Sequence, residues 1–288
     1  MKHRQLGDLQ LRRIVESIWN IDPGFFFTDK PRDLWEPHFS WLCPAALDKG
    51  SWQLQLPMQS YIVQTPHHNI LIDTCVGSRK RLPRRPEWDG TTAHDGYVTA
   101  LNGHGLRFED IHFVMCTHLH TDHCGWNTRL AEGRWVPTFP NARYIFSKAE
   151  YEYLDRHKNE IYEQNVQPIV ESGLADLVTG HFDLNEYVKV EPTPGHTPGH
   201  YCVHLRSKGE HAVVTGDILH SPIQCVYPEW HNNYDWDKEQ GAATRRTFME
   251  RYADTDSLIC PIHFPLPSAG KFRRRGNSFG FLWDHHDW

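Results

Sequence analysis

The amino-acid sequence predicts an α/β fold made of two half-domains, each a mixed β-sheet flanked by helices on its outer face. Strand-like and helical patterns follow one another in the order strands, helices, strands, helix and strand, which is typical of such a layered fold. No internal repeat, low-complexity tract or linker divides the 288 residues, so a single domain over residues 1–288 is expected. Hydrophobic residues make up 39% of the chain and include 11 Trp, 11 Tyr and 14 Phe, enough apolar area for one core.

The expected elements follow from local patterns. Strands are predicted where short apolar or alternating segments are separated by Pro, Met-Gln or His-His, and the pair Ser147 and Glu150 forms a capping-box pattern that opens a helix. A glycine closes the first helix, and a buried strand follows it. The predicted strands are residues 52–56, 60–64, 69–73, 111–116, 187–191, 201–205, 211–215 and 257–261, and the predicted helices are 98–106, 147–157, 161–172 and 238–252, the last with Asp237 as its N-cap.

The remaining parts of the chain are less regular. Residues 1–50 carry aromatic residues among Pro and Asp, and we expect an arm on a partner subunit of a homodimer, a wall over a pocket, or core aromatics under a long loop. Residues 51–265 are the expected core and 266–288 a C-terminal tail. The basic run Lys271–Arg275 is interpreted as a solvated surface stretch.

Charge and cysteine usage narrow the function class. A formal net charge of −6 disfavours nucleic acid or an anionic membrane as the main partner. The seven cysteines are scattered without a CxxC pair, which indicates free thiols in a reducing cytoplasm. The sequence shows neither a secretory signal pattern nor an apolar run of about 20 residues, so a cytoplasmic protein with a small-molecule substrate is expected.

Four potential metal ligands stand within six residues in the segment Thr117–His123, directly after the strand predicted at 111–116. In extended geometry His118 and His120 point to the same side, so both imidazoles can reach one metal ion. A turn then brings Asp122 and His123 towards a second ion. Packing alone does not demand the order His-x-His-x-Asp-His, so the segment predicts a metal site.

Three further strands end in a ligand-type residue. His196 follows the strand at 187–191 within Thr-Pro-Gly-His, Asp217 follows the strand at 211–215, and His263 ends the last strand. Because α/β sheets place function at strand ends, a rim shared by all four segments is expected.

In order and spacing, these segments resemble the metallo-β-lactamase superfamily, and most closely its quorum-quenching lactonase and organophosphate hydrolase branch. The resemblance runs from about Ile62 to His263. It implies a four-layer αβ/βα sandwich with a dinuclear site between the sheets. Carried over by position, His118, His120 and His196 would hold one metal ion, Asp122, His123 and His263 the other, and Asp217 would bridge them.

Several other residues that could bind metal are not assigned as ligands. Asp73 matches the family's Leu-Ile-Asp-Thr segment and is expected either to orient a ligand or to be a turn aspartate after a strand. Cys124 is interpreted as a small packing residue because the ligand set is already complete. Five histidines fit no ligand position and are interpreted as non-ligands: His67, His68, His200, His285 and His286.

Histidine and carboxylate ligands favour two Zn²⁺ ions, although Mn²⁺, Fe²⁺ or Co²⁺ suit the same set. The expected reaction is attack of a metal-bridging hydroxide on a small hydrophobic lactone or ester. Asp217 disfavours a dedicated β-lactamase, because β-lactamases of this fold carry Cys or Ser there. The alternatives are an organophosphate triester hydrolase, an aryl esterase, a glyoxalase-II-like thioesterase and a metal-binding module without turnover. Apolar walls are expected from Trp126 and the aromatic residues of 19–52, which could equally be core.

The candidate catalytic residues are Asp122, Asp217 and His220. His220 stands three residues beyond Asp217, at the place where the lactonases that this chain resembles carry a tyrosine. A neutral imidazole there can donate one N–H to a developing oxyanion or leaving alkoxide. The alternative is a histidine hydrogen-bonded in a loop away from substrate.

Overall fold

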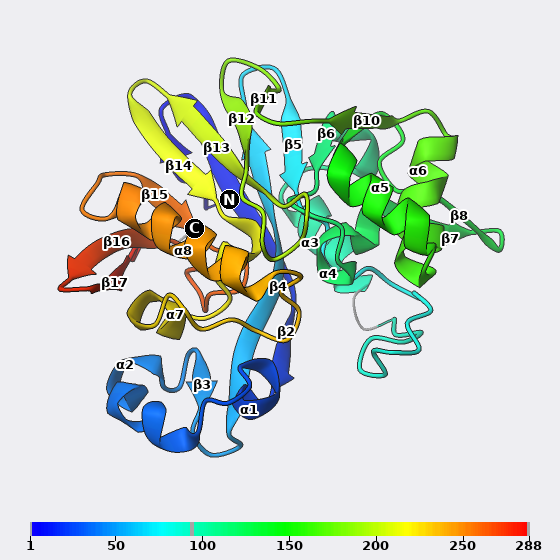
Figure 1. The fold of residues 1–288 in the computed structure, drawn as a ribbon. Helices are drawn as coiled ribbons and strands as arrows, with labels where there is room; N and C mark the ends of the chain where they lie inside the picture. The colour runs from blue at the N-terminus through cyan, green and yellow to red at the C-terminus, as the bar shows by residue number, and fades with distance from the viewer. Residues whose placement is uncertain (1, 93–94, 287–288) are drawn as a thin grey trace.

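Two mixed β-sheets pack face to face in this computed structural model, which describes residues 2–92 and 95–286 (Figure 1). The first sheet contains, in spatial order, β1 (Arg4–Leu6), β2 (Leu9–Ile21), β4 (Gln53–Gln64), β5 (Asn69–Ile72), β6 (Phe113–Met115), β9 (Arg143–Ser147) and β10 (Ala175–Val178), with β3 (Leu47–Asp48) paired to β4. The second contains β11 (Phe182–Asp183), β12 (Val188–Pro192), β13 (Tyr201–Ser207), β14 (Glu210–Val214), β15 (Leu258–Cys260), β16 (Gly270–Arg275) and β17 (Ser278–Trp283). β7 (Thr128–Ala131) and β8 (Arg134–Pro137) form a separate hairpin.

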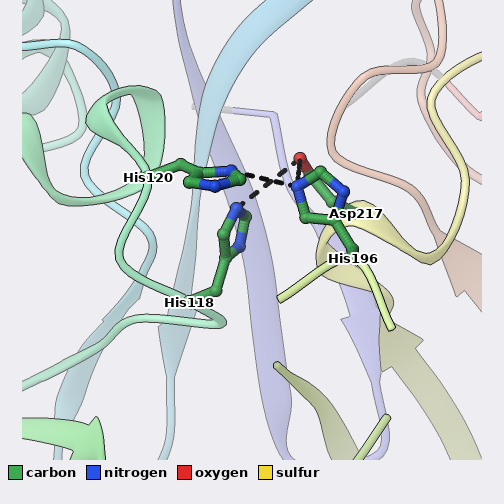
Figure 2. Close-up of side chains that lie close together, drawn as sticks. All are labelled: His118, His120, His196 and Asp217. Atoms are coloured by element: carbon green, nitrogen blue, oxygen red, sulfur yellow. Dashed lines mark hydrogen bonds and ion pairs between the residues drawn. The ribbon is translucent and has the colours of Figure 1, made fainter. Parts of the chain in front are cut away.

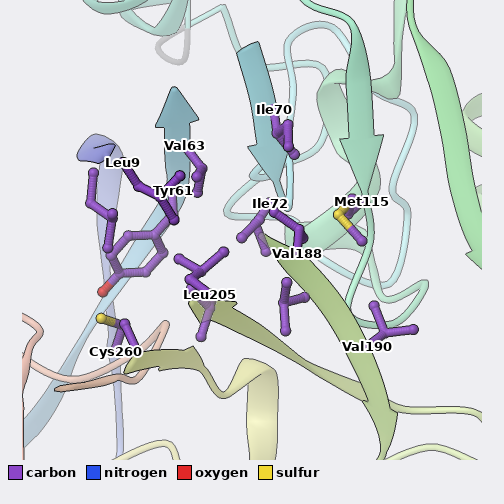
Figure 3. Packing of buried hydrophobic residues seen from close by; sticks show 14 of the residues in the cluster. Leu9, Tyr61, Val63, Ile70, Ile72, Met115, Val188, Val190, Leu205 and Cys260 are labelled. Carbon is purple, nitrogen blue, oxygen red and sulfur yellow. The ribbon is translucent and has the colours of Figure 1, made fainter. Parts of the chain in front are cut away.

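The central core lies between the two sheets and follows from strand alternation. On β4, Tyr61 and Val63 face this core while Ile62 faces the helices on the other side. Val203 and Leu205 of β13 meet them from the second sheet, whereas Cys202 points outward to α8. Figure 3 shows side chains of both sheets meeting in this layer.

Helices cover the outer face of each sheet, as the sequence predicts. The first sheet packs against α3 (Gly96–Gly103), α5 (Lys148–His157) and α6 (Gln167–Glu171), and the second against α8 (Lys238–Tyr252). The shorter helices are α1 (Pro23–Phe26), α2 (Phe39–Leu42), α4 (Thr121–Cys124) and α7 (Ile223–Val226). The layer order is therefore helix, sheet, sheet, helix, which confirms the predicted four-layer sandwich. No helix among residues 2–92 and 95–286 is long and apolar enough to cross a membrane.

The N-terminal segment extends the core beyond the bounds of 51–265 that the sequence suggested. β1 and β2 belong to the first sheet, and the 13-residue strand β2 pairs with β4 from Gln10 to Ile21. Charged residues on β2 interrupt its apolar alternation, so the sequence pattern does not reveal a strand. The stretch from α1 to β3 packs against β4 and Trp230 in an aromatic cluster in which Phe27 and Trp35 are buried.

β4 is one strand where two, at 52–56 and 60–64, were expected. Pro57 lies inside it opposite Ile18, close to a β-bulge between Val15 and Ser17. Proline lacks the N–H that a regular ladder requires, and the neighbouring bulge lets the strand continue past it.

The C-terminal segment also differs from the expected tail. The run Lys271–Arg275 lies on β16 and pairs with β17, and Phe272 and Phe279 of this hairpin are buried against α8. Phe272 of the run faces the core, whereas Lys271 and Arg273 are partly exposed and Arg274 and Arg275 are exposed, as the sequence predicted for the basic residues.

The helix predicted at 161–172 is a π-helical turn, Tyr162–Val166, followed by α6. The capping box predicted at α5 is wrong: Ser147 precedes the helix but makes no side-chain cap hydrogen bond. Asp237 does cap α8, since its carboxylate accepts a hydrogen bond from the backbone N–H of Gln240 at 2.9 Å.

Candidate metal centre

Loops that follow β6, β12, β14 and β15 bring seven sequence-predicted residues together at one end of the sandwich. Each loop leaves a buried strand, so its first side chains are held at a fixed position on the rim. These residues are His118, His120, Asp122, His123, His196, Asp217 and His263, and they form two groups whose ligand atoms lie within 4.8 Å of one another.

The first group contains His118, His120, His196 and Asp217 (Figure 2). Nε2 of His196 lies 3.2 Å from Oδ2 of Asp217 and 3.0 Å from Nδ1 of His120. Nε2 of His118 lies 3.7 Å from the same Asp217 oxygen. Two imidazoles therefore face one oxygen of Asp217, and the ring of His120 lies beside them.

The second group contains Asp122, His123 and His263. Oδ2 of Asp122 lies 3.5 Å from Nε2 of His123 and 3.6 Å from Nε2 of His263. Oδ1 of Asp217 lies 3.2 Å from each of these nitrogens. Asp217 thus presents one carboxylate oxygen to each group, the arrangement that a bridging ligand requires.

Hydrogen bonds at the far side of the imidazoles fix their protonation. The Nδ1 atom of His123 donates to Oδ2 of Asp73 at 2.9 Å, that of His196 to Oδ1 of Asp235 at 2.8 Å, and that of His263 to the carbonyl of Pro57 at 2.9 Å. A nitrogen that donates at Nδ1 leaves an unprotonated Nε2 in a neutral imidazole. The Nε2 atoms of these three rings therefore point into the site, and each can give its lone pair to a cation when the ring is neutral.

The donor atoms fit divalent cations. Nε2 of His118 and Oδ1 of Asp217 are buried and make no hydrogen bond to any described residue. Nε2 of His123 lies 3.3 Å from Nε2 of His263, so two acceptor nitrogens face each other across a short gap. Buried acceptors without donors are costly, and cations placed between them would satisfy the whole set. Imidazole and carboxylate ligands are those that Zn²⁺ favours.

The pKa values follow from burial and from the carboxylates. Burial, aided by His196, lowers the pKa of His120 to about 3. Burial opposes the ionised form of Asp217, but the surrounding imidazoles hold its pKa well below the usual range. For His196 burial is outweighed by Asp217 and Asp235, which raise its pKa to about 9 in the metal-free chain. Its Nε2 therefore binds a proton there at pH 7, and a bound cation would replace that proton.

Asp73 lies in the position that the sequence suggested for an orienting residue. Besides His123, its carboxylate accepts hydrogen bonds from the backbone N–H of Thr117 at 2.7 Å and from the Thr117 hydroxyl at 2.9 Å. It therefore ties the start of the histidine segment to one imidazole. Asp235 orients the imidazole of His196 through its hydrogen bond to Nδ1. No local pattern around Asp235 distinguishes it in the sequence.

Glu150 and His200 fix the positions of the loops that carry the ligand atoms by accepting hydrogen bonds from their backbone N–H groups. Glu150, predicted as part of a capping box, instead accepts hydrogen bonds from the N–H groups of Leu119 at 3.3 Å and Gly199 at 2.7 Å. His200, predicted as a non-ligand, accepts the N–H of Asp217 at Nε2, 2.9 Å away, and its Nδ1 contacts the Thr193 hydroxyl. Burial lowers the pKa of His200 to about 3, which keeps this acceptor unprotonated.

His220 lies at the site and not in a distant loop. Its Nε2 is 3.0 Å from Oδ2 of Asp217, and its Nδ1 is 3.3 Å from the side-chain amide nitrogen of Asn232. Since the amide N–H₂ of Asn232 is a donor, Nδ1 accepts and Nε2 carries the proton. Burial lowers the pKa of His220 to about 4, so the ring is neutral at pH 7.

A cavity of about 160 Å³ opens onto the two groups. Its apolar walls include Trp19, Phe26 and Leu56, so part of the predicted aromatic segment does line it. Trp126 does not. It stacks on Tyr97 with ring centroids 5.3 Å apart, and it belongs to the core on the helical side of the first sheet.

Cys124 and four of the histidines that the sequence predicts to be non-ligands lie outside the two groups of ligand atoms. Cys124 is buried, and its Sγ contacts the carbonyl oxygen of His120 at 3.1 Å, in keeping with a packing residue. His67 and His68 lie in the turn between β4 and β5, and His285 and His286 follow β17.

Comparisons with known proteins identify relatives of this chain. An N-acyl homoserine lactonase of Bacillus cereus is 28% identical over 165 residues, which cover 54% of this chain and 60% of the relative. The probable metallo-hydrolase YybB of Bacillus subtilis is 30% identical over 132 residues, covering 42% of this chain and 55% of the relative. The chain thus spans only 55–60% of the length of these two curated relatives.

Solved structures share the fold over nearly the whole chain. The hydrolase AbOPH of the β-lactamase superfamily superposes with a TM-score of 0.81 at 24% identity, covering 99% of this chain and 98% of that one. AidC, a dizinc quorum-quenching lactonase, superposes with a TM-score of 0.80 at 21% identity, covering 100% and 98%. The family model described as the metallo-beta-lactamase superfamily matches residues 55–258, and the chain belongs to this superfamily.

Proposed function

We propose that this protein is a dinuclear metal-dependent hydrolase that opens a small hydrophobic lactone or ester. The observation that carries the proposal is the position of Asp217, whose two carboxylate oxygens each face a separate group of ligand atoms. His118, His120 and His196 would hold one cation, and Asp122, His123 and His263 the other. Two divalent ions so placed lower the pKa of water towards about 7 and polarise a substrate carbonyl.

The protein's own residues supply the rest of the chemistry. Asp73, Asp235 and the carbonyl of Pro57 fix the imidazoles that would hold the ions, so little reorganisation is needed when substrate binds. His220 holds a proton on Nε2 at the cavity wall and can give that N–H to the developing oxyanion or to the leaving alkoxide.

The cavity favours an apolar substrate next to the reacting carbonyl. Trp19, Phe26 and Leu56 exclude water from one side of it. Lactones come first among the candidates, because curated relatives of this chain are named N-acyl homoserine lactonases. AidC is described in complex with the product N-hexanoyl-L-homoserine, which supports the same class.

The test is a substrate panel with zinc-loaded protein. Lactones, phosphotriesters, thioesters and β-lactams are assayed side by side, with chelator-stripped protein as the control. We expect kcat/KM for a lactone to exceed that for any β-lactam by at least about 10²-fold, which corresponds to about 2.7 kcal/mol of transition-state binding. Higher values for penicillins or cephalosporins would contradict the proposal, and higher values for thioesters would favour the glyoxalase-II-like alternative.

A further inference from the structure

An arginine is enclosed by aromatic rings at the outer end of the cavity. The guanidinium carbon of Arg85 lies 4.4 Å from the ring centroid of Tyr234, 5.1 Å from that of Trp19 and 5.3 Å from that of Trp88. We call these three rings the aromatic box. They also contact one another, since the centroids of Trp19 and Trp88 are 5.1 Å apart. Cation–π attraction and these contacts hold the guanidinium in one place.

The aromatic box stands between two cavities. Arg85, Trp19, Trp88 and Tyr234 line the 160 Å³ cavity at the candidate metal centre, and the same four residues line a neighbouring cavity of about 880 Å³. Arg85 therefore lies at the junction of the two cavities. A substrate with its scissile carbonyl at the metal centre and an acyl chain that extends into the larger cavity would contact Arg85.

Arg85 has unused hydrogen-bonding capacity at this junction. Its Nη1 donates to the Tyr234 hydroxyl at 2.8 Å and lies 3.9 Å from a carboxylate oxygen of Glu87. Among the described residues, neither Nε nor Nη2 of Arg85 has a hydrogen-bond acceptor. Its side chain is 26% exposed, so a ligand can reach these N–H groups. A guanidinium is weakly hydrated and rigid, and it loses little when it binds an oxygen in a fixed direction.

We propose that Arg85 and the aromatic box form a binding subsite for an oxygen acceptor on the acyl side of the substrate, beyond the scissile bond. The proposal rests on the hydrolytic function proposed above. The ligand chemistry is a carbonyl or carboxylate oxygen, which the free N–H groups of Arg85 bind through charge-assisted hydrogen bonds. The rings meanwhile contact the apolar part of the same chain. The protein is thus specific for lactones that carry an amide or carboxylate, and it discriminates against plain alkyl lactones.

The first experiment crosses enzyme variants with matched substrates. An N-acyl amino lactone, an alkyl lactone of equal length without the amide, and a lactone whose side chain ends in a carboxylate are assayed with wild type, Arg85→Met and Arg85→Lys. We expect Arg85→Met to lose at least about 10-fold more kcat/KM on the amide or the carboxylate substrate than on the alkyl lactone. Arg85→Lys should recover only part of this difference, because the ammonium lacks the planar fork.

The source of the oxygen follows from which substrate responds. A larger selective loss on the amide lactone identifies a carbonyl, and a larger loss on the third substrate identifies a carboxylate. Arg32→Met is the matched control, because Arg32 packs over Trp52 at 4.5 Å and lines neither of the two cavities. An equal loss by Arg85→Met on all three substrates would overturn the proposed subsite while leaving the hydrolytic function intact.

A binding measurement tests the subsite without turnover. Trp19 and Trp88 report on the aromatic box, so their fluorescence is titrated with the N-acyl γ-lactam that corresponds to the amide substrate. We expect saturable quenching with wild-type and Arg32→Met zinc-loaded protein, and a Kd at least about 10-fold weaker with Arg85→Met and Arg85→Lys. If no lactone is hydrolysed but the lactam binds in this way, the subsite stands and the proposed reaction fails. An equal Kd in wild type and both Arg85 variants would refute the subsite.

Discussion

His220 points an N–H group at Asp217, whereas His123, His196 and His263 donate from Nδ1 to outer partners and turn their Nε2 atoms towards the same carboxylate. The Nε2 atom of His220 lies 3.0 Å from Oδ2 of Asp217, and the side-chain amide of Asn232 sets its tautomer. The opposite tautomer at His123, His196 and His263 is set by Asp73, Asp235 and the carbonyl of Pro57. The hydrogen-bond partners on the outer side of the rings therefore distinguish His220, with its proton on Nε2, from three imidazoles whose Nε2 atoms could hold a cation.

The first prediction concerns this proton. His220→Ala is expected to fold and to keep its metal content, yet to lose roughly 10–10³-fold in kcat, the range for one oxyanion donor or a modest general acid. His220→Tyr should recover part of the loss on lactones, because a phenol O–H can replace the N–H. Steady-state kinetics and elemental analysis of both variants provide the check. Wild-type kcat in His220→Ala at unchanged metal content would return His220 to a purely structural role.

Metal stoichiometry tests the bridging position of Asp217. We expect two divalent ions per chain in the purified protein and fewer in Asp217→Ala, with most of the activity lost, because each Asp217 oxygen faces one ligand group. Chelation should abolish wild-type activity, and two equivalents of zinc should restore it. Full activity with one tightly held ion would rule out a dinuclear mechanism.

Asp235 should act on the metal through His196. Its Oδ1 accepts from Nδ1 of His196 at 2.8 Å, and the imidazole and Arg245 help to lower the pKa of Asp235 to about 2 against the effect of burial. Asp235→Asn removes the charge at nearly constant shape, so zinc affinity should fall about 10–100-fold in a competition assay with a chromophoric chelator.

Asp237→Ala is the matched control for Asp235→Asn. Asp237 caps α8 from the same loop but contacts no member of the ligand groups in the described structure. The loss of this cap should lower the free energy of unfolding by about 1 kcal/mol without changing zinc affinity. Equal effects of the two variants on zinc binding would show that loop stability, and not the hydrogen bond to His196, sets the affinity.

A pH-dependent contribution to stability is expected from Glu191, away from the metal centre. Hydrogen bonds from His204 and Arg251 lower its pKa from 4.5 to about 2, although burial acts in the opposite direction. Between these values the unfolded chain binds more protons than the folded one, so this stabilisation is present above pH 4.5 and disappears as the pH falls towards 2.

Glu191→Gln should therefore cost about 1–3 kcal/mol of unfolding free energy at pH 7 and roughly half as much or less near pH 3. Urea denaturation of metal-free wild type and variant at several pH values measures the difference. Because Arg251 donates to the same carboxylate, Arg251→Met should reproduce part of the loss, and the double variant should lose less than the sum. A difference that is constant from pH 7 to pH 3 would contradict this account.

Local patterns predicted two half-domains, each a sheet with helices on its outer face, and strand ends with possible metal ligands, while the resemblance to the superfamily implied the sandwich and the ligand set. The order His-x-His-x-Asp-His after a buried strand fixes which side chains share a rim, because alternation in a strand and the following turn act over only a few residues. The same holds for Asp237 at the start of α8. Strand β2 was missed because the charged residues along it conceal its period, and the β16–β17 hairpin was missed behind the basic run Lys271–Arg275.

Only the tertiary structure decided what lies around the ligand atoms. Asp235 meets His196 across 39 residues, Glu150 meets Gly199 across 49, and Arg85 meets Tyr234 across 149. Neither sequence periodicity nor a helix-capping pattern reveals such pairs, because they depend on how separate loops pack at the ends of the two sheets. The sequence therefore indicated which atoms could coordinate a cation, while the tautomers of the imidazoles, the proton on His220 and the position of Arg85 depend on hydrogen bonds and ring contacts that form only when distant segments meet.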